Sequence, residues 1–90
     1  MAKEARVRDE IRSYIVGTWL SGDDRGFTDD TDLHTSGILD SFSMLALTGF
    51  LGDAFDVRIA PTDVTADTFR SVDSLTALVV GRIAAKPAYV

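Results

Sequence analysis

Residues 37–43 of the chain read Gly-Ile-Leu-Asp-Ser-Phe-Ser, and at this point a long polar segment gives way to an apolar one. Asp40 belongs to the residue types favoured at helix N-caps, because its carboxylate accepts hydrogen bonds from the unpaired amides of the first turn. The residues that follow it are mostly apolar as far as Phe55. The stretch therefore predicts a helix over Ser41–Phe55 with Asp40 as its cap.

The predicted helix has two different faces on a helical wheel. The face expected in the core carries Met44, Leu47, Leu51, Ala54 and Phe55, with Phe50 at its edge. The opposite face carries Phe42, Leu45, Ala46, Gly49 and Asp53. Phe42 and Leu45 are large and apolar on a face that should otherwise meet water. They indicate either a docking surface or the single exposed apolar residues of an ordinary surface, and the wheel leaves both alternatives open.

Helical spacing also appears on both sides of this segment. A first amphipathic helix is predicted over Lys3–Ser21, with apolar positions at Val7, Ile11, Tyr14, Ile15, Thr18 and Trp19. A single turn of helix is expected around Thr65–Phe69. A last helix follows a cap at Ser71 and places Val72, Leu75, Leu78, Val79 and Ile83 on one side. The tail, residues 86–90, is expected to fray.

The segment Ser21–Asp40 is rich in Asp, Gly, Thr and Ser. Its few apolar residues are Phe27, Leu33, Ile38 and Leu39. It is longer than most loops of compact domains, and such loops tend to be functional or disordered, but the apolar anchors favour an ordered one. No stretch alternates with the period of a strand. The fold class predicted is all-α, a four-helix bundle with three longer helices, one short one and a long loop between the first two.

Composition narrows the classes of function. With 90 residues and 46% hydrophobic residues, we expect one domain spanning residues 1–90 and a monomer. The absence of cysteine excludes disulfides and thiolate metal sites, and it is compatible with a reducing compartment. The net charge of -5 argues against nucleic acid as a partner. No segment is apolar enough to enter a membrane, so we expect a cytoplasmic protein.

Three passages resemble the acyl, peptidyl and D-alanyl carrier proteins. Gly37–Phe42 is similar to their Gly-x-x-Asp-Ser-(Leu/Ile/Phe/Met) motif. Phe50–Ile59 is similar to the end of their second helix, and Asp63–Leu75 to the passage that enters their last helix, closest to peptidyl and D-alanyl carriers. The resemblance covers essentially the whole chain and implies the carrier fold, a four-helix bundle of acyl-carrier type.

The resemblance also implies a cofactor and its site. Ser41 would carry a covalent 4'-phosphopantetheine attached by a phosphopantetheinyl transferase, and Asp40 would assist the attachment. Acyl or aminoacyl cargo would ride on the arm as a thioester, supplied by a loading ligase (an adenylation enzyme) and used by downstream acyl-processing enzymes. The residues implied to contact these partners are Phe42, Leu45, Gly49, Asp53 and Leu39. The chain itself would be a carrier and not an enzyme.

One departure from the fatty-acid branch of this family bears on the type of carrier. That branch has several glutamates along its second helix, whereas the only acidic residue of the predicted helix here is Asp53. Recognition would therefore rest on Phe42, Leu45 and the loop, as in peptidyl carriers. With no linker or catalytic domain visible in the sequence, a freestanding carrier of nonribosomal peptide or polyketide synthesis is expected.

Other functions need to be weighed against this one. Ser41 with His34 as base has the residue types of a hydrolase, but no nucleophile elbow accompanies them, and His34 is expected to be a solvated loop residue. The loop carboxylates Asp23, Asp24, Asp29, Asp30 and Asp32 lack the spacing of a calcium loop, and no metal site is predicted. The remaining alternative is a helical adaptor whose Phe42/Leu45 face binds one partner. In that case Asp40-Ser41 would be an ordinary helix cap, and Ser41 would be unmodified.

Overall fold

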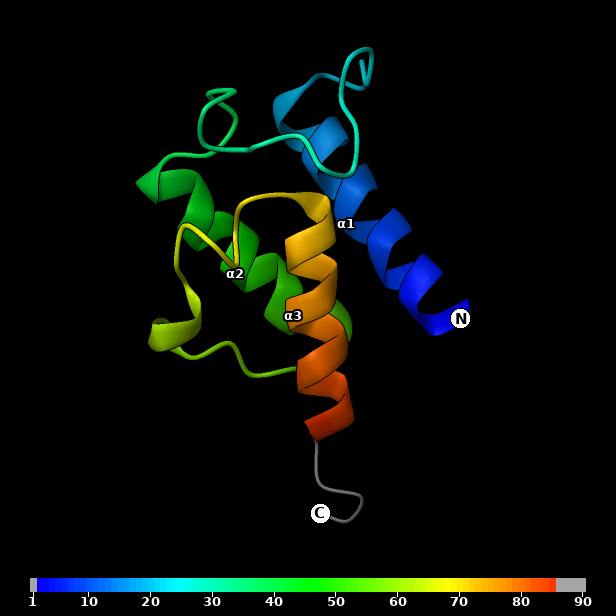
Figure 1. Ribbon diagram of the computed structural model, residues 1–90, viewed down its shortest axis with the longest axis vertical. Helices are drawn as coiled ribbons and strands as arrows, with labels where there is room; N and C mark the ends of the chain where they lie inside the picture. The colour runs from blue at the N-terminus through cyan, green and yellow to red at the C-terminus, as the bar shows by residue number, and fades with distance from the viewer. Residues whose placement is uncertain (1, 86–90) are drawn as a thin grey trace.

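Three α-helices account for most of the chain in the computed structural model, which describes residues 2–85 (Figure 1). They are α1 (Ala2–Trp19), α2 (Ser41–Phe55) and α3 (Val72–Ala85), and no strand occurs in the described residues. The all-α class and the long loop before α2 are confirmed. The expected fraying of residues 86–90 lies outside the described part of the chain. Within residues 2–85, no helix is both long and apolar enough to cross a membrane.

The short fourth element differs from the expectation. It is a 3-10 helix, η1 (Pro61–Asp63), and the residues around Thr65–Phe69 form a turn instead of a helix. Thr65 and Thr68 explain the turn, because each hydroxyl oxygen accepts a hydrogen bond from the other residue's backbone N–H at 3.1 Å. Such side-chain bonds compete with the helical bonds of the backbone. Pro61 opens η1, where its fixed φ suits the first helical position.

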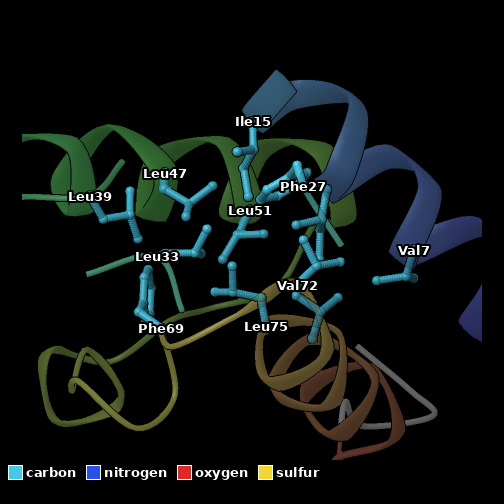
Figure 2. Close-up of a cluster of buried hydrophobic side chains, with 12 residues drawn as sticks. Val7, Ile15, Phe27, Leu33, Leu39, Leu47, Leu51, Phe69, Val72 and Leu75 are labelled. Carbon is cyan, nitrogen blue, oxygen red and sulfur yellow. The ribbon is translucent and has the colours of Figure 1, made fainter. Parts of the chain in front are cut away.

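The core lies where the three helices and both connections meet (Figure 2). Leu47 and Leu51 of α2 are fully buried, and Ser43, one turn before Leu47, is buried with them. The buried face of α2 therefore follows the spacing 43, 47 and 51. It is rotated from the expected face, so that Ala54 is exposed and was wrongly placed in the core. The other buried apolar residues are Val7, Ile11, Ile15, Phe27, Leu33, Leu39, Val57, Phe69, Val72, Leu75 and Val79.

The loop between α1 and α2 is pinned to the rest of the fold, as its apolar residues predicted. Phe27, Leu33 and Leu39 are buried. The backbone N–H of Leu33 donates to the carbonyl of Arg70 at 2.7 Å, which ties the loop to the connection before α3. These contacts fix the end of the loop from which α2 begins.

Two arginines of α1 hold the middle of the same loop. Arg12 donates to the carbonyl of Phe27 at 2.6 Å and to Asp29 at 3.1 Å, and its guanidinium lies 4.8 Å from the centre of the Phe27 ring. Arg8 lies 3.5 Å from Asp29 and 3.2 Å from Asp73 of α3. These pairs are partly exposed, so each ion pair stabilises the fold only weakly. Together they bring the middle of the loop against α1 and α3.

Candidate functional site

The start of α2 is capped as the sequence predicted. Asp40 has an extended backbone (φ -125°, ψ -173°), and its Oδ1 accepts a hydrogen bond from the Ser43 backbone N–H at 2.8 Å. Its own carbonyl accepts the Met44 N–H at 2.9 Å, which is the first bond of the helix. The bond from Ser43 lowers the pKa of the Asp40 carboxyl below its ordinary value. Asp40 is therefore an ionised cap at neutral pH.

A turn at Gly37 and the buried side chain of Leu39 place the Asp40 cap at the surface. Gly37 has φ +84°, a conformation that L residues rarely adopt, and its N–H donates to the His34 carbonyl at 3.1 Å. The N–H of Leu39 donates to the carbonyl of Leu33 at 2.9 Å. Because both leucine side chains are buried, the chain leaves the core at Asp40. The glycine of the Gly-x-x-Asp-Ser pattern is thus required by the turn.

Ser41 is the first residue of α2 and is exposed. The hydroxyl makes no hydrogen bond within residues 2–85, because Asp40 provides the cap for the helix. It lies where the unpaired amides and the positive end of the helix dipole stabilise an anion such as a phosphate ester. Figure 1 shows this end of α2 at the outer edge of the molecule. A long substituent on the Ser41 oxygen therefore has room and a favourable electrostatic setting.

The outward face of α2 is a continuous and largely apolar surface, which we call the α2 stripe. All its members are exposed in the structure: Phe42, Leu45, Ala46, Gly49 and Asp53. Phe42 is 80% exposed and Leu45 is 71% exposed, and no other large hydrophobic residue of the described chain is as open to solvent. Asp53 supplies the only charge. The stripe begins directly beside Ser41.

Leu39 does not belong to this surface, although it was predicted to contact partners. Its side chain is 4% exposed and packs in the core cluster. The reason is local: the loop uses Leu39 as the apolar anchor that fixes the residue before the cap. A contact between this side chain and a partner would require the anchor to leave the core.

The structure places His34 differently from expectation. The residue is half-buried, and its Nε2 atom is buried without a hydrogen-bond partner among the described residues. It is therefore not a solvated loop residue. No hydrogen bond joins His34 to Ser41 in residues 2–85, and the serine thus lacks the base that a hydrolase would need.

The loop carboxylates form ion pairs and hydrogen bonds within the fold. Asp24 and Asp29 pair with Arg12, and Asp23 pairs with Arg25. Asp32 accepts hydrogen bonds from the backbone N–H groups of Thr35 and His34 at 3.0 and 2.9 Å, and these bonds lower the pKa of its carboxyl. Among the described residues, no three His, Asp or Glu side chains are grouped to hold a metal ion.

Removing the Asp40 carboxylate is expected to weaken the start of α2 in a pH-dependent way. Asp40→Ala loses the hydrogen bond to Ser43 and is destabilised, whereas Asp40→Asn keeps a good cap without the charge. Because the pKa of Asp40 is lowered in the folded protein, its contribution is present above the carboxyl's unfolded pKa of about 3.9 and is lost as the pH falls through the lower folded value.

The measurement is urea unfolding of the wild type and both variants from about pH 7 to about pH 2. The stability difference between the wild type and Asp40→Asn should shrink on the acid side. Other carboxyls with lowered pKa values, such as Asp23, Asp32 and Asp63, remain in all three proteins and cancel in the comparison. A difference that stays constant with pH would contradict the assigned hydrogen bond.

Comparison with known proteins gives one family. The chain matches the family model described as "Phosphopantetheine attachment site" over residues 14–79, which run from the second half of α1 into α3 and include Asp40, Ser41 and the α2 stripe. No curated protein matches the chain.

Proposed function

Since the chain belongs to the family of proteins with a phosphopantetheine attachment site, we propose that Ser41 is the residue that carries the group. The cofactor of this family is 4'-phosphopantetheine, bound covalently to a serine. When bound, its arm supplies a terminal thiol that holds acyl groups as thioesters. The protein is therefore a carrier, and carriers of this family generally pass substrates between enzymes.

The observation that carries the choice of Ser41 is its position at the start of α2 with a free, exposed hydroxyl. The other serines of the matched region fit less well. Ser43 and Ser71 are buried, and Ser74 is hydrogen-bonded to Ser71. Ser21 and Ser36 are exposed, but they lie in loop turns without a following helix N-terminus.

In the attachment reaction, the Ser41 hydroxyl oxygen would form a new bond to the phosphorus of the pantetheine phosphate. The diphosphate bond of coenzyme A breaks, adenosine 3',5'-bisphosphate leaves, and the serine proton passes to a base of the phosphopantetheinyl transferase. Asp40 adjoins the serine and is exposed, so we assign it to help orient this encounter. Its bond to Ser43 fixes the first turn of α2 that presents the hydroxyl.

We assign the α2 stripe to partner recognition, with Phe42, Leu45, Gly49 and Asp53 as its contacts. The stripe is exposed, adjoins Ser41 and carries one carboxylate, which suits enzymes that dock through apolar contacts more than through a basic surface. The partners are a phosphopantetheinyl transferase, a loading ligase that supplies acyl or aminoacyl groups, and the enzymes that use the cargo. Modest affinity suits a carrier that must leave each of them.

The finer assignment is a freestanding peptidyl or aminoacyl carrier of nonribosomal peptide or polyketide synthesis. Its support is the apolar, nearly uncharged stripe and the similarity of Asp63–Leu75 to peptidyl and D-alanyl carriers. We propose that residues 1–90 form one carrier domain, because the buried side chains of all three helices join one core cluster. We also propose that it works in the cytoplasm, since reducing conditions keep the thiol of the arm free.

The test is the mass of the intact protein after incubation with coenzyme A and a promiscuous phosphopantetheinyl transferase. A gain of one phosphopantetheine supports the carrier function. No gain, with the protein folded and the transferase active on a known carrier, contradicts it and favours a helical adaptor with an unmodified Ser41.

Gly49 provides a separate test of the stripe. It lies inside α2, and a Cβ atom built there would meet nothing within 4 Å, so neither the backbone nor the packing of this chain requires a glycine. Gly49→Ala is expected to stabilise the fold by about 0.5–1 kcal/mol, since glycine is unfavourable inside helices. If partners approach α2 closely, the added methyl group should also slow modification by the transferase.

Gly17→Ala is the matched control, because Gly17 is also an exposed glycine inside a helix with open space around it, but on α1. Urea unfolding should show similar stabilisation of both variants. Initial rates of modification, at a protein concentration well below saturation, should fall only for Gly49→Ala. Equal rates for the two variants would remove Gly49 from the docking surface.

A further inference from the structure

A groove lies between α1 and α2, away from Ser41 along the second helix. It has a volume of about 440 Å³ and is lined by Asp9, Glu10, Ser13 and Tyr14 of α1 and by Phe50 of α2. Phe50 follows Ala46 of the α2 stripe by one helical turn. The groove therefore adjoins the surface assigned above to partner recognition.

The α2 side and the α1 side of the groove meet in an aromatic cluster. The rings of Tyr14 and Phe50 are stacked, with centroids 3.9 Å apart and planes 12° from parallel. Trp19 packs edge-on against Tyr14, and Phe55 packs edge-on against Phe50. All four residues are only partly buried, so the cluster offers ring surface to a bound group.

The rim of the groove carries two carboxylates, and only one of them is paired with an arginine among the described residues. Glu10 forms an exposed ion pair with Arg6 at 3.2 Å. Asp9 forms no ion pair or hydrogen bond with the described side chains. The carboxylates of the neighbouring loop differ, because Asp24 and Asp29 are both paired with an arginine. A cation is thus the complementary ligand for the rim.

The chain already contains one example of the expected interaction. The guanidinium of Arg12 lies over the Phe27 ring and donates to the carboxylate of Asp29. A planar guanidinium suits such a place because it stacks on a ring while its N–H groups reach an acidic side chain. The groove presents the same two components, with Tyr14 and Phe50 as rings and Asp9 as carboxylate, and no arginine is among the described residues that line it.

We propose that the groove binds an arginine side chain of an enzyme that acts on the carrier, as a charged contact beside the apolar α2 stripe. This inference rests on the proposed function for the partner, but the groove's preference for a guanidinium does not. Because the stripe has only Asp53 to attract a basic surface, Asp9 gives recognition an electrostatic component on a second element. It also favours partners whose docking site combines apolar contacts with one basic residue.

The test uses a small probe and the intact chain. N-acetyl-argininamide is titrated into the ¹⁵N-labelled protein at low salt, where exposed charges are least screened, and amide and aromatic resonances are followed. Saturable shifts are expected around Asp9, Ser13, Tyr14 and Phe50. Asp9→Asn should weaken binding about two- to fivefold, the range measured for exposed ion pairs. Asp30→Asn removes the same charge from an exposed loop residue outside the groove and should bind as the wild type does.

The neutral isostere N-acetyl-citrullinamide distinguishes binding that depends on the positive charge from nonspecific binding. The proposal is overturned if the isostere binds equally, if no saturable shifts occur, or if Asp9→Asn binds as tightly as the wild type. The attachment of phosphopantetheine is measured on the same samples. Normal attachment without arginine binding would refute only the proposed arginine site. Arginine binding without attachment would refute the carrier function and leave the arginine site supported.

Discussion

Ser41→Ala is expected to abolish the gain of one phosphopantetheine that the wild-type protein shows with coenzyme A and a promiscuous phosphopantetheinyl transferase. The substitution removes one hydroxyl group, and no other serine combines exposure with a position at the start of a long helix. The fold should be unaffected. The cap bond runs from Ser43 N–H to Asp40, and alanine is a good helix former.

Ser36→Ala is the matched control, because Ser36 is an exposed serine in the loop that leads to the same helix. It should be modified to the same extent as the wild type. Circular dichroism and urea unfolding establish that all three proteins are folded alike. Modification of Ser41→Ala would move the attachment site elsewhere, and peptide mapping of the modified protein would then identify the serine that carries the group.

The sequence was most informative where one local rule determined the structure. The bounds of α2, the cap at Asp40 and the buried anchors Phe27 and Leu33 were all predicted, because capping and apolar spacing act within a few residues. Exposure of Phe42 and Leu45 was predicted in the same way. A helical wheel places these residues on one face whatever packs on the other.

Predictions failed where the tertiary arrangement decides. A wheel does not fix the angle at which α2 meets its neighbours, so Ser43 was missed as a buried residue and Ala54 was wrongly placed inside. Leu39 was assigned to partners by resemblance, but the return of the loop onto Leu33 uses it as an anchor. The contacts of Arg12 with the loop join residues 15 and 17 positions apart, and no local pattern signals them.

The groove between α1 and α2 also could not be predicted from the sequence. Asp9, Tyr14 and Phe50 are unremarkable in the sequence, where an acidic residue on a helix is ordinarily a solvated one. Only the pairing of α1 with α2 stacks the Phe50 ring on the Tyr14 ring and makes both line the same groove as Asp9. A preference for a cation at this place is thus a property of the assembled helices.

Two leucines on α2 separate stability from recognition. Leu47 is fully buried and Leu45 is 71% exposed, although they lie two residues apart on one helix. Leu47→Ala is expected to cost about 2–5 kcal/mol, because the lost contacts leave a cavity in the core. That is a large fraction of the stability of a domain of this size. Leu45→Ala should change the free energy of unfolding by no more than about 0.5 kcal/mol.

Recognition should depend on the two residues in the reverse order. Leu45→Ala removes apolar surface from the α2 stripe and should lower kcat/KM for the transferase while the fold remains intact. Leu47→Ala should be modified normally at temperatures where unfolding curves show it to be folded, since its side chain does not reach the surface. Equal destabilisation by both substitutions would mean that Leu45 is packed within the fold. The outward face of α2 would then be structural, and the docking surface would have to lie elsewhere.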